Sequence, residues 1–271
     1  MRPIIFVKYY DKASTILAAD QVSEALSERG VDSQAIYPEN LAEYRDCTVV
    51  FIKTSRLLHV IQARVQGCRT VLDVHDTVIF KSRLKNQWLF DGLILRNTRA
   101  YEDYNRSGKN DAEILLHWDP RFSTNTAGDE ELRIAYLGDR RSLHLWDQIP
   151  GVDYIDSDYF ERARAFNCHL SIRMPGKESL YKPAVKVSTA GACGAVLITT
   201  RDEASLELLG PDYPFYTGYD LDEIIETIDF ARETKGSETW QLALRRLAEV
   251  RDRTSLERLI DEYVTYFERF S

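Results

Sequence analysis

Short apolar runs alternate with amphipathic helical stretches along almost the whole chain, and no other feature of the sequence limits the fold as strongly. In the N-terminal part, strands are expected at residues 4–7, 48–52, 70–74, 92–95 and 113–116. Helices are expected at residues 13–29 and 57–66, where apolar residues recur three and four positions apart and a glycine follows each stretch. Repeated strand–helix–strand units of this kind predict a parallel sheet covered by helices.

A small, polar segment at residues 123–129 interrupts this rhythm and reads as a linker. Strands are expected again at residues 132–137, 152–155, 168–172, 195–199 and 213–216, and from Leu221 onwards the pattern is helical. We therefore predict an α/β protein with two Rossmann-like domains, residues 1–126 and 127–271. Ligands of such sheets bind at the carboxyl ends of the strands, so a site is expected in a cleft between the two domains.

Composition and charge restrict the functions that such a chain can have. The formal net charge of −8 argues against nucleic-acid binding, which needs a basic surface. No run of apolar residues approaches the roughly 20 that a membrane helix requires, and the N-terminus reads as a first strand and not as a signal peptide. These features predict a cytoplasmic protein without a transmembrane segment. The cysteines lack C-x-x-C spacing and are expected to be reduced core residues: Cys47, Cys68, Cys168 and Cys193.

The segment from Cys168 to Thr200 carries the strongest chemical signal, because it reads as strand, loop, helix and strand. Pro183 suits the first turn of the helix, and several of the residues that follow are small, which lets the helix lie close to another backbone. Cations gather around the expected helix start: Arg173, Lys177, Lys182 and Lys186. Free N–H groups, the positive end of the helix dipole and these cations together predict a diphosphate site. The alternative is a solvated helix start with ordinary surface lysines.

This segment, "LSIRMPGKESLYKPAVKVSTAGACGAVLIT", resembles the second domain of GT-B glycosyltransferases. The likeness is to a variant with a "KPxxK" loop, since Tyr181 and Thr189 stand where the common E-x7-E motif has its glutamates. "LRIAYLGDRRS" resembles the opening strand of the same domain, and "AEILLHWDP" resembles the last strand of the first domain. The terminal helices resemble the tail that crosses back to pack on the first domain.

The resemblance implies a metal-independent transfer of sugar from a nucleotide-sugar donor to an acceptor hydroxyl, in glycan or glycoconjugate biosynthesis. The acceptor would be a glycan, a lipid-linked molecule or a protein, and no cofactor is expected because the donor is itself a substrate. The implied donor-binding residues are Gly138, Arg173, Lys182, Lys186, Ser188 and Thr189. Gly138 would allow the donor to approach the backbone closely, and the cations would neutralise the phosphates.

The candidate catalytic residues His75 and Asp76 come from the first domain, in "VLDVHDTV" at the end of an expected strand. An imidazole or carboxylate there could act as base or nucleophile, or could bind the acceptor; the alternative is a strand-end aspartate that caps the next segment. Asp156 and Asp158 imitate a D-x-D metal motif but fit helix caps better, so no metal site is expected.

Two other functions remain open at this stage. The missing glutamate pair and the short chain fit a non-catalytic relative that binds a nucleotide or glycan. The second open function is that of another two-domain sugar-nucleotide enzyme, such as an epimerase. Dinucleotide oxidoreductases, P-loop NTPases and α/β-hydrolases lose their main support, because the sequence lacks G-x-G-x-x-G after a strand, G-x-x-x-x-G-K-[ST] and G-x-S-x-G.

Overall fold

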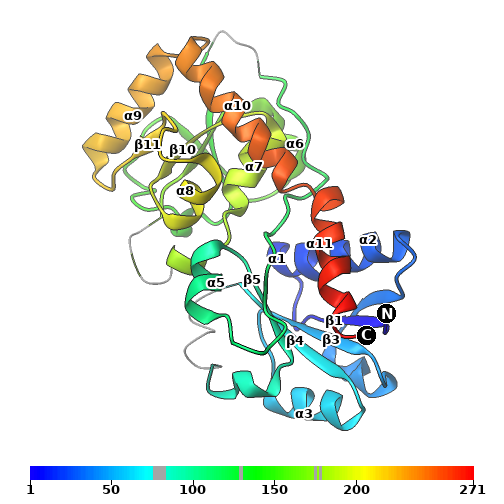
Figure 1. The fold of residues 1–271 in the computed structure, drawn as a ribbon. Helices are drawn as coiled ribbons and strands as arrows, with labels where there is room; N and C mark the ends of the chain where they lie inside the picture. The colour runs from blue at the N-terminus through cyan, green and yellow to red at the C-terminus, as the bar shows by residue number, and fades with distance from the viewer. Residues whose placement is uncertain (76–83, 128–130, 174–175, 177–178) are drawn as a thin grey trace. The chain divides into compact units, whose positions relative to one another are not determined.

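A computed structural model describes residues 1–75, 84–127, 131–173, 176 and 179–271 (Figure 1). The chain forms two compact units. Unit 1 contains Met1–His117, Leu180–Pro183 and Leu256–Ser271, and unit 2 contains Trp118–Ser179 and Ala184–Ser255. None of the helices in the described residues combines the length and the apolarity needed to cross a membrane.

Unit 1 is built on a parallel sheet with the strand order β2-β1-β3-β4-β5-β6. Its strands are β1 (Ile4–Val7), β2 (Ser33–Ile36), β3 (Thr48–Ile52), β4 (Arg69–Val74), β5 (Gly92–Leu95) and β6 (Ala112–Glu113). Its helical segments are α1 (Ala13–Thr15), η1 (Ile16–Gln21), α2 (Val22–Glu28), η2 (Pro38–Glu43), α3 (Leu57–Val65), η3 (Leu84–Leu89), α5 (Thr98–Tyr104) and α11 (Leu256–Glu268).

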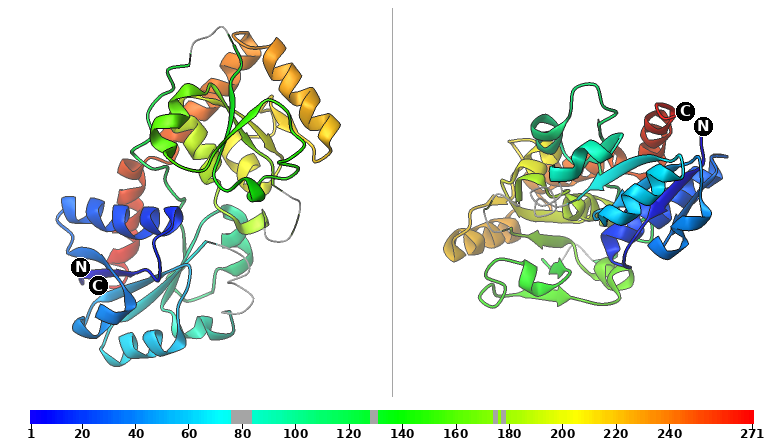
Figure 2. Two further views of the ribbon diagram at one scale, coloured as in Figure 1. Left: turned by 180° about the vertical axis from the view of Figure 1, so that it is seen from behind. Right: turned by 90° about the horizontal axis from the view of Figure 1, so that it is seen from below.

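Helices cover both faces of this sheet, which explains why its central strands are apolar along their whole length. Helices α2 and α11 lie on one side and α3 on the other (Figures 1 and 2). Every residue of β1 and β3 is buried. The strand order changes direction at β1, which pairs with β2 on one side and β3 on the other, and such switch points are where ligands of α/β sheets bind.

Unit 2 contains a second parallel sheet, with the order β11-β10-β9-β7-β8. Its strands are β7 (Ile134–Leu137), β8 (Val152–Ile155), β9 (Cys168–Ser171), β10 (Val196–Thr200) and β11 (Tyr216–Thr217). Its helical segments are η4 (Arg140–Ser142), α6 (Tyr159–Arg162), η5 (Ala163–Ala165), α7 (Val185–Cys193), α8 (Glu203–Leu209), α9 (Leu221–Glu233) and α10 (Glu238–Arg253). Here the order changes direction at β7, between β8 and β9.

The small residues of α7 allow α10 to approach it closely, as the sequence predicts. A Cβ atom at Gly191 would lie 2.4 Å from the carbonyl oxygen of Leu247 and 3.2 Å from the amide nitrogen of Arg251. Real Cβ atoms do not approach a backbone atom as closely as 2.4 Å, and 3.2 Å is already a tight contact. Glycine at this position therefore lets α10 pack on α7.

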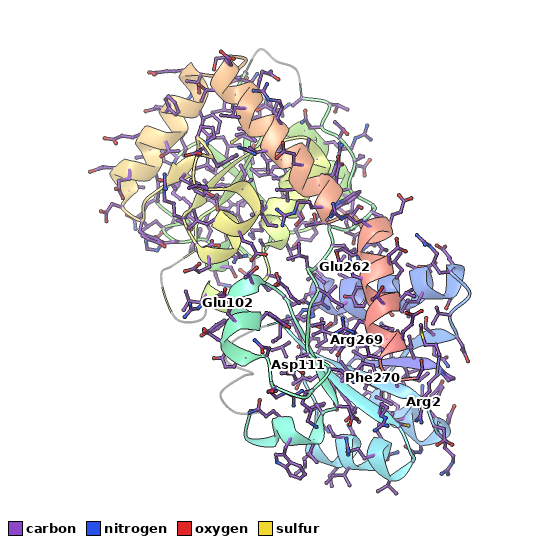
Figure 3. All side chains as sticks on the ribbon, in the orientation of Figure 1. Arg2, Glu102, Asp111, Glu262, Arg269 and Phe270 are labelled. Carbon is purple, nitrogen blue, oxygen red and sulfur yellow. The ribbon has the colours of Figure 1, made fainter. Side chains whose placement is uncertain are left out.

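The last helix, α11, packs within unit 1. The rings of Phe6 and Phe267 meet edge to face with centroids 6.0 Å apart, and the hydroxyl of Tyr266 donates to the carbonyl of Leu93 at 3.4 Å. Phe270, labelled in Figure 3, reaches β5, where a Cβ at Gly92 would lie 2.9 Å from its ring. Aromatic side chains thus join the end of the chain to the first sheet.

The elements differ from the expected ones at several boundaries. Strand β2 was not predicted, and β6 is shorter than the expected strand at 113–116. Helix α7 begins at Val185, so Pro183 lies before it and not in its first turn. All four cysteines are buried, as expected of core residues.

Candidate nucleotide-binding site

The carboxyl end of β7 and the first turn of α7 meet through Lys186. Its Nζ donates a hydrogen bond to the carbonyl of Leu137 at 3.0 Å and lies 3.3 Å from the ring centroid of Tyr136. Gly138 follows with a φ of 128°, a conformation that favours glycine. A Cβ at this position would lie 3.7 Å from the Nζ of Lys186. Gly138 and Lys186, two of the residues that the sequence analysis assigned to donor binding, therefore lie next to each other.

The electrostatics of this cluster suit an anion. Burial lowers the pKa of Lys186 well below its usual value, and repulsion from Arg173, just beyond the end of β9, lowers it further. Among the described residues, no carboxylate contributes to that pKa. Burial, with a further contribution from Lys186, also lowers the pKa of His169 to about 4, so this imidazole is neutral. A phosphate group that binds beside Lys186 and Arg173 would offset this repulsion and favour the charged form of the lysine.

The start of α7 adds backbone donors to the cluster. The N-cap residue is Ala184, which provides no side-chain hydrogen bond to the helix. The first N–H groups of a helix need acceptors from outside it, and together with the helix dipole they favour phosphate. Lys186 lies in this first turn.

The other predicted donor residues occupy different surroundings. Lys182 belongs to the segment that clusters with unit 1, and its carbonyl accepts a hydrogen bond from Asn97 Nδ2 at 3.3 Å. Ser188 and Thr189 are buried in α7, and the hydroxyl of Ser188 is directed to the carbonyl of Ala184 at 3.4 Å. The described contacts thus bring Gly138 and Lys186 together, and Arg173 lies near enough to lower the pKa of Lys186.

An open hollow of about 610 Å³ lies where the segments after β7 and β8 meet. It is lined by Asp139, Arg140, Arg141, Trp146, Tyr154, Asp156 and Tyr159. Arg141 forms an ion pair with Asp139 at 2.8 Å, and the guanidinium of Arg140 stacks over the Trp146 ring at 5.2 Å. Sequence reasoning missed these two arginines, although their position directly after Gly138-Asp139 in "GDRRS" was a usable signal.

In unit 1, His75 belongs to a buried charge network. Its Nε2 lies 2.9 Å from Asp73 Oδ1, and the same carboxylate is held by both Arg96 Nε, at 2.7 Å, and Arg96 Nη2. Arg96 Nη1 in turn donates to the hydroxyl of Tyr263 on α11 at 2.8 Å. Strand β4, the end of β5 and α11 are thereby joined.

The network sets the protonation of its members. Burial alone would raise the pKa of Asp73, but the charge of Arg96 and the contact with His75 outweigh it and the pKa is lowered. Burial lowers the pKa of His75 despite the opposing charge of Asp73, so the imidazole is neutral near pH 7. Contact with Asp73 favours the tautomer with the proton on Nε2, which leaves Nδ1 as the acceptor. Asp76, the other predicted catalytic residue, lies outside the described residues.

The described residues contain no group of three or more His, Cys, Asp or Glu side chains arranged to hold a metal ion. Asp158 is the N-cap of α6, with a φ of 50°, and Asp156 lines the hollow described above.

Solved structures of glycosyltransferases share this architecture over the full chain. HepE from Anabaena, in complex with UDP-glucose, matches with a TM-score of 0.71 at 9% identity, covering 99% of this chain and 100% of that one. Sucrose-phosphate synthase from Thermosynechococcus elongatus matches with a TM-score of 0.71 at 11% identity, covering 100% and 99%. A glycosyltransferase from Rickettsia africae matches with a TM-score of 0.69 at 10% identity, covering 100% and 99%.

The chain therefore has the two-sheet α/β fold of GT-B glycosyltransferases, which confirms the fold class expected from the sequence. No protein-family model matches the chain, and no curated protein sequence matches it. At such low identities the likeness establishes the fold, and the chemistry has to be argued from the site.

Proposed function

We propose that this protein is a GT-B glycosyltransferase that moves a sugar from a nucleotide-sugar donor to an acceptor hydroxyl. The observation that carries the proposal is the contact of Lys186 with the carboxyl end of β7 at Leu137 and Gly138, where Arg173 is near enough to act on its charge. The fold supports it, because HepE of Anabaena was solved with UDP and with UDP-glucose on the same architecture.

In the proposed donor site, Arg173 and Lys186 hold the two phosphates and neutralise the charge that develops on the leaving diphosphate. Gly138 leaves room for the donor beside β7. We assign Lys182, Ser188 and Thr189 supporting roles, Lys182 as a further cation and the two hydroxyls as hydrogen-bond donors. With these cations present, we expect no metal requirement.

On the acceptor side, we propose that His75 and Asp76 serve the reacting hydroxyl. Nδ1 of His75 is the acceptor nitrogen in the favoured tautomer, and Asp76 is the alternative base. Helix α11 would be the returning tail of the GT-B fold, fixed to the first sheet through Tyr263 and Arg96. The cytoplasm remains the predicted location, and a glycan, a lipid-linked molecule or a protein the predicted acceptor.

A non-catalytic binder is the second candidate. It is favoured by Tyr181 and Thr189, which replace the usual glutamates. The hydroxyl of Tyr181 donates a hydrogen bond to Asp103 Oδ2 at 3.0 Å, and Thr189 is almost fully buried. Such a protein would bind a nucleotide or glycan without turnover.

The test is to incubate the protein with UDP-, GDP- and ADP-sugars and to measure released nucleoside diphosphate. An enzyme releases it slowly by hydrolysis even without acceptor, and Lys186→Met should reduce the rate. Binding of a nucleotide sugar with no release above that of buffer would favour the non-catalytic candidate. Conversion of the sugar without release of diphosphate would favour an epimerase.

A further inference from the structure

Two cysteines meet at the amino ends of neighbouring strands in unit 1. Cys47 directly precedes β3 and Cys68 directly precedes β4, and their Sγ atoms lie 3.3 Å apart. The strands pair in parallel with Thr48 opposite Arg69, so the two cysteines precede paired residues. Neighbouring strands lie about 4.8 Å apart, which falls within the Cα separation of about 4.4–6.8 Å that a disulfide spans. A disulfide here therefore needs little movement of the backbone.

Backbone hydrogen bonds hold the two segments that carry these sulfurs. The amide of Arg69 donates to the carbonyl of Cys47 at 2.9 Å. The amide of Asp46 donates to the carbonyl of Gln66 at 3.1 Å, just before Cys68. Because hydrogen bonds flank the pair on both sides, the thiols stay neighbours in the folded chain. Groups held together in this way react with each other far faster than free groups in solution.

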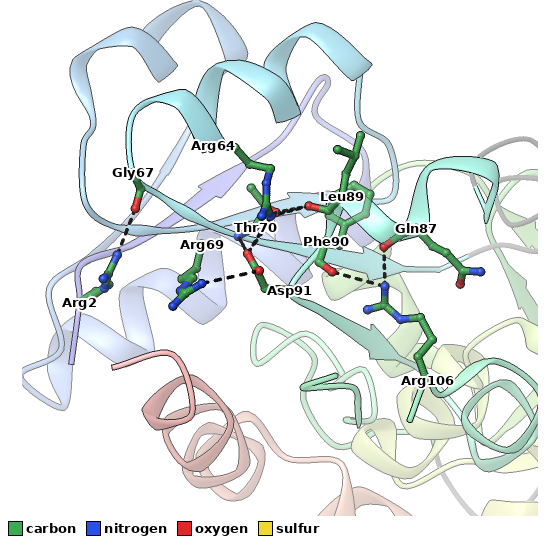
Figure 4. Close-up of polar contacts among 10 residues, drawn as sticks. All are labelled: Arg2, Arg64, Gly67, Arg69, Thr70, Gln87, Leu89, Phe90, Asp91 and Arg106. Carbon is green, nitrogen blue, oxygen red and sulfur yellow. Dashed lines mark hydrogen bonds and ion pairs between the residues drawn. The ribbon is translucent and has the colours of Figure 1, made fainter. Parts of the chain in front are cut away.

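The surroundings of the pair favour a thiolate at one of the two sulfurs. The hydrogen bond between the sulfurs lowers the pKa of Cys68 to about 6 and raises the pKa of Cys47. Arg2 lies beside them, where its Nη1 donates to the carbonyl of Gly67 at 3.1 Å (Figure 4). The charge of Arg2 lowers the pKa of both thiols, and for Cys68 the opposing effects of burial and of Asp46 are outweighed. A thiolate is the form of cysteine that attacks an oxidant.

The other two cysteines have different surroundings. Cys168 and Cys193 are fully buried in unit 2, and burial raises the pKa of each to about 12. In the part of the chain that the structure describes, the one contact between two sulfurs joins Cys47 to Cys68. The second pair therefore provides buried thiols of low reactivity for comparison.

We propose that Cys47 and Cys68 form a redox-modification site, at which a peroxide converts the two thiols into a disulfide. Cys68 is the more exposed of the two, at 5% against 1%. Its thiolate attacks one oxygen of hydrogen peroxide, the O–O bond breaks and hydroxide leaves, which gives a sulfenic acid. The Cys47 sulfur then attacks the sulfenic sulfur, and its proton leaves with the hydroxyl group as water. Counted from two thiols, the protein loses two electrons and two protons, and the peroxide becomes two water molecules.

The disulfide would tie β3 to β4 at their amino ends and close a loop that contains α3. The two cysteines are 21 positions apart, and closing a loop of that size reduces the freedom of the unfolded chain. Oxidation should therefore stabilise unit 1. This inference does not rest on the proposed function.

Peroxide treatment of the reduced full chain tests the proposal on the wild type. The number of free thiols in the denatured protein should fall from four to two, and the intact mass should fall by two hydrogen atoms. Tryptic digestion without reductant should give one new species, in which residues 46–53 are linked to residues 65–69. Dithiothreitol should reverse all three changes. The thermal midpoint of the oxidised protein should exceed that of the reduced protein by about 5–10 °C.

Two variants separate the pair from the other cysteines. Cys168→Ser/Cys193→Ser is the control and should form the disulfide as the wild type does. Cys47→Ser removes the second thiol, so Cys68 should accumulate as a sulfenic acid that dimedone labels, with no linked peptide and no rise in the thermal midpoint.

The wild-type measurement decides the proposal even where a variant does not fold. Four free thiols after peroxide treatment of the folded wild type would overturn it, as would a linked peptide that contains Cys168 or Cys193. Conversion of Cys68 to the sulfinic acid at equal rates in the wild type and in Cys47→Ser would also overturn it, because Cys47 would then fail to intercept the sulfenic acid.

Discussion

Replacing Lys186 by Met separates the charge of this residue from its packing. Methionine keeps an unbranched apolar stem against Tyr136 but removes the ammonium group, which donates to Leu137 in the free protein. A hydrogen bond to a charged group contributes about 1.5–3 kcal/mol, so the Kd for the cognate nucleoside diphosphate should rise about 10- to 150-fold. Titration calorimetry measures it directly. Lys186→Ala should show a similar loss.

The stability of the free protein should respond differently. The lowered pKa of Lys186 means that its charge is disfavoured in the folded state. Folding therefore works against the proton on this lysine, so removing the lysine should leave the free energy of unfolding near neutral pH unchanged or raise it. The exposed Arg246→Ala is the control and should alter neither the affinity nor the stability.

The pH dependence of diphosphate affinity tests the role of Lys186 independently. A bound diphosphate raises the pKa of Lys186, so binding takes up a proton wherever the free lysine is neutral. The wild-type affinity should therefore fall, relative to that of Lys186→Met, as the pH rises through the lowered pKa of the free protein. Met and wild-type proteins with equal affinities at every pH would remove Lys186 from the site.

Four further changes have defined outcomes. Asp76→Asn should reduce turnover about a hundredfold or more while donor affinity stays within a few-fold. Near-normal turnover would instead favour the alternative, in which Asp76 caps the segment that follows the strand. Arg96→Met leaves the buried Asp73 without its arginine partner and should lower the free energy of unfolding in urea by about 3–5 kcal/mol. Gly191→Ala places a methyl group against a helix backbone and should destabilise by about 1–3 kcal/mol, despite the better helix propensity of alanine. EDTA should leave nucleotide binding unchanged, whereas a loss restored by manganese would point to Asp156 and Asp158.

The parallel strands that helices cover on both faces were predictable, because burial on both sides makes them continuously apolar. β1 and β3 are examples. Strand β2 escaped detection because it is an edge strand with mixed burial and a polar start, Ser33-Gln34. β6 stops at Glu113 because its partner β5 ends at Leu95, and only the pairing between strands sets that limit.

The assignment of Gly138 and Lys186 to one candidate site followed from two general rules, that strands end at the binding edge and that helix starts attract anions. The network of Asp73, Arg96 and Tyr263 did not, because its hydrogen bonds join residues 23 and 167 positions apart. No local pattern signals such pairs. Arg140 and Arg141 lay within the quoted motif "LRIAYLGDRRS", but the stacking of Arg140 depends on Trp146, which the following loop brings to it.

The central claim is that the second sheet carries a nucleotide-sugar site. Titration calorimetry of the full chain with UDP, GDP, ADP and the corresponding nucleotide sugars tests it most directly. The account predicts one saturable site for at least one nucleotide, bound with and without sugar, and much weaker binding in Arg173→Ala and Lys186→Met. Absence of binding by every nucleotide at millimolar concentration, or binding that both variants retain, would contradict it.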